Sequence, residues 1–69
     1  MTNKDILFVG DNDSIFVNNS AVNKEQLDTV YAIYNRITGE QKQPNGCGRC
    51  WRNTKKRVYQ EYLKKVNII

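Results

Sequence analysis

The hydrophobic residues of this chain change their spacing along its length. Residues 6–9 and 15–17 are short apolar runs, rich in β-branched and aromatic side chains, and the turn-forming residues 10–14 separate them. Short apolar runs bounded by turn residues are typical of strands. We therefore predict a β arm or hairpin over residues 1–20. It must lie on helices or join a neighbouring chain's sheet, because an isolated two-stranded hairpin is only marginally stable.

From residue 23 onwards the apolar positions follow a helical period. Asn23 with Gln26 three residues later matches a capping box, and Gly39 is a typical helix stop. We predict a helix over residues 23–38. Its buried face consists of Leu27, Val30, Tyr31, Tyr34 and Ile37.

A second helical pattern follows the loop of residues 39–46, in which Pro44 blocks helix continuation. Every fourth residue from Cys50 to Val66 is apolar or small, so we predict a helix over residues 47–66. A short loop between helices usually joins antiparallel neighbours. The predicted fold class is α+β but mainly α: residues 1–69 form a single small domain, with an N-terminal β arm followed by an antiparallel helical hairpin.

The charge of the chain is uneven. The net charge of +4 divides into −3 over residues 1–28 and +7 over residues 29–69. Helical spacing places most of the late cations opposite the apolar stripe, whereas Lys55 falls nearer that stripe and would have to extend its ammonium outwards. Such a face binds nucleic-acid phosphates or an acidic protein surface, or it is merely solvated. The candidate binding residues are Arg49, Arg52, Lys55, Lys56, Arg57 and Lys64.

Cys47 and Cys50 form a CxxC motif where the last helix is predicted to start. The pair has three interpretations: a redox site, zinc ligands, or small packing residues at a tight turn. A structural zinc site needs four ligands, and the chain has no histidine and no third cysteine. A zinc ion bound by Cys47 and Cys50 would therefore be shared between two chains.

The composition argues against an enzyme and against a membrane span. Without histidine, no Ser-His or Cys-His pair is possible, and no phosphate-binding glycine loop is present. No apolar run approaches the roughly 18 residues that a membrane span needs. The N-terminal sequence does not fit a signal peptide, because Asp5 precedes a short apolar run. We expect a non-enzymatic, intracellular protein.

One stretch resembles a known group of sequences. Its sequence pattern is similar to that of small uncharacterised proteins of tailed phages. The pattern consists of Tyr34-Asn35, Thr38-Gly39-Glu40, Lys42, Cys47-Gly48, Cys50 and Arg52. The resemblance implies a phage origin. Together with the predicted β arm and the one-sided charge, it favours a protein of the virion or the host cytoplasm that docks on other phage structural subunits and is oligomeric. We expect a structural or adaptor protein that uses its basic helix and its N-terminal arm. The alternative is a small DNA- or RNA-binding regulator.

Overall fold

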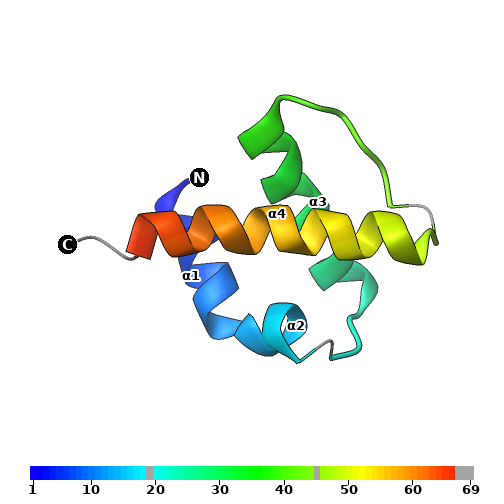
Figure 1. The fold of residues 1–69 in the computed structure, drawn as a ribbon, viewed down its shortest axis with the longest axis horizontal. Helices are drawn as coiled ribbons and strands as arrows, with labels where there is room; N and C mark the ends of the chain where they lie inside the picture. Colours follow the sequence, from blue (N-terminus) through cyan, green and yellow to red (C-terminus); the bar gives the residue numbers. More distant parts are fainter. Residues whose placement is uncertain (19, 45, 67–69) are drawn as a thin grey trace.

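A computed structural model describes residues 1–18, 20–44 and 46–66, and these residues form four helices. The helices are α1 (Asn3–Asp11), α2 (Asp13–Val17), α3 (Lys24–Thr38) and α4 (Gly48–Val66). Figure 1 shows α4 lying across the other helices. Within these described ranges there is no strand, and no helix has both the length and the apolar character to cross a membrane.

The predicted β arm is wrong, because residues 3–11 and 13–17 are helical. The Thr2 hydroxyl accepts a hydrogen bond from the Asp5 N–H at 3.2 Å, and the Asp5 carboxylate accepts one from the Thr2 N–H at 3.1 Å. These reciprocal bonds make a capping box that starts α1. Asp5 and Val9 are both buried, whereas Leu7 is 65% exposed. Burial at a four-residue spacing is the pattern of a helix rather than of a strand.

The start of α1 is also joined to α3. The Arg36 guanidinium donates hydrogen bonds to both carboxylate oxygens of Asp5, and the bond from Nε measures 3.1 Å. Burial alone would raise the pKa of Asp5, but the bonds from Arg36 and from the Thr2 backbone outweigh it, so the pKa lies below its ordinary value. The ion pair therefore fixes α1 against the end of α3.

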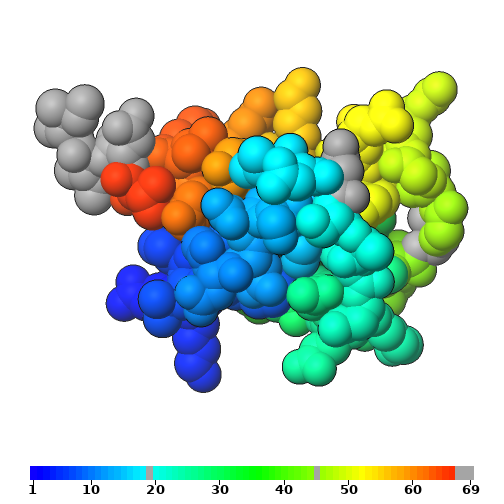
Figure 2. Space-filling model, turned by 90° about the horizontal axis from the view of Figure 1, so that it is seen from below, coloured from blue at the N-terminus to red at the C-terminus, as the bar shows by residue number. Residues whose placement is uncertain are grey.

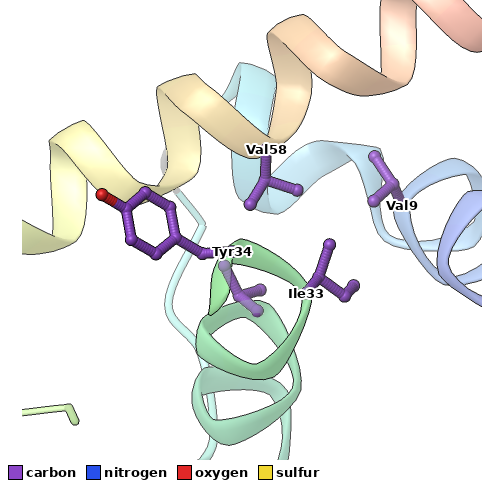
Figure 3. Close-up of a cluster of buried hydrophobic side chains, with 5 residues drawn as sticks. Val9, Ile33, Tyr34 and Val58 are labelled. Carbon is purple, nitrogen blue, oxygen red and sulfur yellow. The ribbon is translucent and has the colours of Figure 1, made fainter. Parts of the chain in front are cut away.

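The two longer helices lie within one residue of their predicted bounds, but they do not form an antiparallel hairpin. The start of α3 has its capping box from Asn23 and Gln26, and Gly39 ends the helix with a φ of 76°. Figures 1 and 3 show α3 crossing α4 steeply. In Figure 1 the connecting segment arcs from the end of α3 to the far end of α4. Residues 39–47 connect the end of α3 to the start of α4, and a connection of this length does not force the two helices to lie side by side.

The core lies where α1, α3 and α4 meet. Val9 of α1 and Val58 of α4 contact the α3 residues Val30, Ile33 and Tyr34, as Figure 3 shows in part. Four of these five side chains have no exposed surface, and Tyr34 is 9% exposed. The core of so short a chain is thin, so contacts at its edges matter for stability.

Aromatic stacking borders this core on two sides. Phe16 of α2 stacks on Tyr59 of α4, and Tyr59 stacks on Tyr62, each pair with ring centroids 5.7 Å apart. Tyr31 of α3 stacks on Trp51 of α4 at 6.0 Å. Stacked rings contribute about 0.5–1.5 kcal/mol per pair beyond the area they bury. The aromatic residues therefore hold α4 at both of its ends.

Candidate polyanion-binding face and cysteine pair

Five of the six predicted binding residues are exposed on the outer side of α4. We call Arg49, Arg52, Lys56, Arg57 and Lys64 the basic face. Between Arg49 and Lys64 it extends about 22 Å along the helix axis at 1.5 Å per residue. In Figure 2 the yellow and orange atoms of α4 form the upper edge of the molecule, so the helix borders solvent along its length.

Among the described residues, the basic face forms one ion pair at most. Lys64 lies 4.0 Å from Glu61, at the limit of an ion pair. Arg49, Arg52, Lys56 and Arg57 form no ion pair with any residue in the described part of the chain. Four cations therefore project into solvent from one side of one helix.

Lys55, the sixth predicted residue, does not lie on this face. It is 7% exposed, and its ammonium donates a hydrogen bond to the Ile15 carbonyl at 3.3 Å. The same ammonium lies 5.2 Å from the centre of the Trp51 ring, within cation–π range. Burial lowers the pKa of Lys55, and the neighbouring charge of Arg52 lowers it further. Lys55 thus joins α2 to α4 instead of facing solvent.

The loop before α4 is held by a set of contacts that the sequence analysis did not predict. Tyr34 donates a hydrogen bond to Glu40 at 2.7 Å, and the Lys42 ammonium lies 5.2 Å from the Tyr34 ring. Asn35 exchanges two hydrogen bonds with the backbone of Lys42, both at 3.0 Å. These contacts link Tyr34 and Asn35 near the end of α3 to Glu40 and Lys42 in the loop. They help to set where the chain enters α4.

Cys47 occupies the cap position immediately before α4. Its sulfur accepts a hydrogen bond from the Cys50 N–H at 3.2 Å, as a side-chain oxygen does at an ordinary N-cap. Hydrogen bonds from the Cys50 thiol and backbone lower the pKa of Cys47, and the same side-chain bond raises the pKa of Cys50. Both cysteines are partly exposed.

A small apolar cavity lies beside the cysteine pair. It has a volume of about 190 Å³. It is lined by Val22, Leu27, Tyr31, Gly46, Cys47, Gly48 and Trp51. Val22 directly precedes the N-cap of α3 and Leu27 lies in the first turn of that helix, so the cavity lies between the starts of α3 and α4.

The described residues contain no group of three or more cysteine, histidine or acidic side chains that could hold a metal ion. Cys47 and Cys50 supply two thiol ligands, which is half of a structural zinc site. Zinc shared between two chains by these cysteines stays a prediction.

Neither a protein-family model, nor a curated protein, nor a solved structure matches the chain. The side chains of the protein itself are therefore the guide to its function. Two arrangements carry chemistry: the basic face, and the cysteine pair beside the apolar cavity.

Proposed function

We propose that the protein is a non-enzymatic nucleic-acid-binding module that contacts phosphates through the basic face of α4. The observation that carries the proposal is the row of exposed cations, four of which form no ion pair within the described part of the chain. Cations that are not neutralised within their own chain attract a polyanion and release its counterions on binding.

The spacing of these residues supports contact with a phosphate backbone. Arg49, Arg52 and Lys56 lie on successive turns of α4, so their side chains leave the helix about 5 Å apart along its axis. Long, exposed side chains at this spacing reach neighbouring phosphates without reading bases. The binding should therefore depend on charge and be indifferent to sequence.

Salt dependence tests the proposal. Fluorescence anisotropy with a labelled duplex and a labelled single strand should show affinity falling about 100-fold between roughly 50 and 200 mM salt, as expected for four phosphate contacts. The double variant R52Q/K56Q should reduce the slope of log affinity against log salt by about two.

A matched control separates the basic face from net charge. The double variant K4Q/K24Q also removes two positive charges, but it removes them from exposed sites on α1 and α3. It should leave the salt slope within about 0.5 of the unmodified protein, because neither lysine contacts phosphate in the proposed mode. Equal losses in the two double variants, or no binding at low salt, would overturn the proposal.

Docking on an acidic protein subunit is the second candidate. The observation in its favour is exposed apolar surface on the same helix: Leu63 is 44% and Val66 46% exposed. Leu63 follows Lys56 by seven residues, so the two lie on the same side of α4. Together with the resemblance to phage proteins, this mixed surface favours an adaptor in a phage particle. The adaptor has no β arm, so α4 would carry the contact.

Self-association is the accessible test of this second candidate. If the neighbouring subunit is a copy of the same chain, native mass spectrometry of the protein should give an oligomer that L63S dissociates, because the apolar contact is lost. The variant Q60S, which changes a polar residue of the same helix, should leave the oligomer intact. A monomer at every concentration would remove self-assembly from consideration.

A further inference from the structure

We propose that Cys47 and Cys50 form a thiol–disulfide exchange site, in which Cys47 is the attacking sulfur and Cys50 the resolving sulfur. The substrate class is a small-molecule disulfide such as glutathione disulfide. Arg49 of the basic face lies between the two cysteines, but its side chain takes no part in the exchange, so the proposal does not depend on nucleic-acid binding.

The backbone brings the two sulfurs together. Cys47 precedes α4 and Cys50 lies in its first turn, so both side chains meet at the N-terminal end of the helix. The Cys50 N–H donates a hydrogen bond of 3.2 Å to the Cys47 sulfur, which places that sulfur against the backbone of Cys50. A disulfide between them therefore needs little movement of the chain.

The surroundings make the two sulfurs unequal. The Cys47 sulfur lies at the N-terminal end of α4 and accepts a hydrogen bond from the Cys50 N–H at 3.2 Å, and both features favour its thiolate. The contact with Cys47 instead favours the protonated form of Cys50, although the nearby charge of Lys42 partly offsets it. Because the thiolate is the nucleophile, Cys47 attacks first.

An incoming disulfide has access to the pair. Both cysteines are partly exposed. Cys47 also lines the apolar cavity of about 190 Å³, together with Trp51 and Tyr31. The attacking sulfur thus borders an open, uncharged hollow next to the helix N-terminus, where a thiolate is stabilised.

The exchange balances as two displacements. The Cys47 thiolate attacks one sulfur of glutathione disulfide, a Cys47–glutathione disulfide forms, and one glutathione thiolate leaves. Cys50 then loses its proton to solvent, its thiolate attacks the Cys47 sulfur, and the second glutathione thiolate leaves. The protein dithiol is oxidised by two electrons, and one glutathione disulfide is reduced to two glutathione molecules.

Glutathione redox buffers test the proposal on the full chain. Unreacted thiols are alkylated at a series of times and again at equilibrium, and the intact mass is measured. The unmodified protein should convert to an unalkylated form lacking two hydrogens as the buffer becomes more oxidising. C50S should stop at one glutathione adduct, on Cys47. This adduct should form about threefold faster than the Cys50 adduct of C47S. The larger thiolate fraction of Cys47 speeds its reaction, but its less basic thiolate is also a weaker nucleophile, which offsets part of that gain.

A denatured control shows whether the fold creates the difference. In urea the two single variants should react at equal rates. Equal rates in the folded protein would overturn the assigned roles, and a dithiol that survives the most oxidising buffer would overturn the site. Zinc that copurifies with the protein and blocks alkylation of both thiols until a chelator is added would overturn it as well.

Discussion

The helices α1 and α3 each begin with a capping box, and the two capping boxes differ in what they contact. At α1 the box pairs Thr2 with Asp5, and at α3 it pairs Asn23 with Gln26. Asp5 is 3% exposed and also binds Arg36, 31 residues away. The Gln26 side chain is neutral and partly exposed, and it adds one hydrogen bond of 3.3 Å to Asn12.

The difference lies in charge and burial. A neutral cap stabilises its own helix by about 1 kcal/mol, whichever elements pack nearby. A buried, charged cap must also be compensated, and Arg36 supplies the compensation from another helix. The box of α1 therefore links local structure to tertiary structure, whereas that of α3 mainly starts a helix.

The largest expected effect comes from D5A. It should lower the free energy of unfolding by about 3 kcal/mol, because it removes a cap and one partner of a largely buried ion pair. Urea titration followed by circular dichroism measures the change.

D11A is the matched control, since Asp11 is an exposed carboxylate at the other end of α1. It should change the free energy of unfolding by less than about 0.5 kcal/mol. If D5A and D11A behave alike, the α1 box does not act as a tertiary anchor and the comparison fails.

Acidification should produce the next largest effect. The pKa of Asp5 in the folded protein lies below its ordinary value of 3.8. The carboxylate therefore contributes its stability above that ordinary value and loses the contribution as pH falls through the folded pKa.

The difference in unfolding free energy between the unmodified protein and D5A should accordingly be constant above about pH 5 and should shrink below pH 4. Urea titrations over a pH series measure this difference. A constant difference down to the lowest pH would show that the ionisation of Asp5 does not supply its stability.

The smallest effect belongs to Q26A, which should cost about 1 kcal/mol at any pH from 3 to 8, because the lost hydrogen bonds are neutral. Urea titration at both ends of this range measures it. E25A, the exposed neighbour, should cost only about 0.3 kcal/mol. A Q26A effect that grows with pH would mean that the α3 box is coupled to a charge, and the contrast between the boxes would narrow.

A sequence pattern identifies a helix when its apolar positions repeat over several turns. It does not identify one when the apolar run is short. The residues from Leu27 to Ile37 repeat through three turns, so α3 was predictable to within one residue. Residues 6–9 span barely one turn, and such a run has no period that separates a helix from a strand. The pairing of Thr2 with Asp5 was the local signal that could have identified α1.

The candidate site divides in the same way. Helical spacing was sufficient to predict the exposed basic face. The inward position of Lys55 depends on the carbonyl of Ile15, 40 residues earlier in the chain, and no local pattern encodes that contact. The steep crossing of α3 and α4 likewise depends on how the two helix surfaces fit together.

The position of Trp51 gives the protein an optical reporter. It is the only tryptophan in the chain, and its ring stacks on Tyr31 of α3 with 17° between the ring planes. Tryptophan emission depends on the polarity around the indole, so separation of α3 from α4 should shift its wavelength without any attached dye. The other aromatic cluster joins Phe16 of α2 to Tyr59 and Tyr62 in the second half of α4, and it contains no tryptophan. Intrinsic fluorescence therefore monitors one end of this helix separately from the whole-molecule helicity that circular dichroism records.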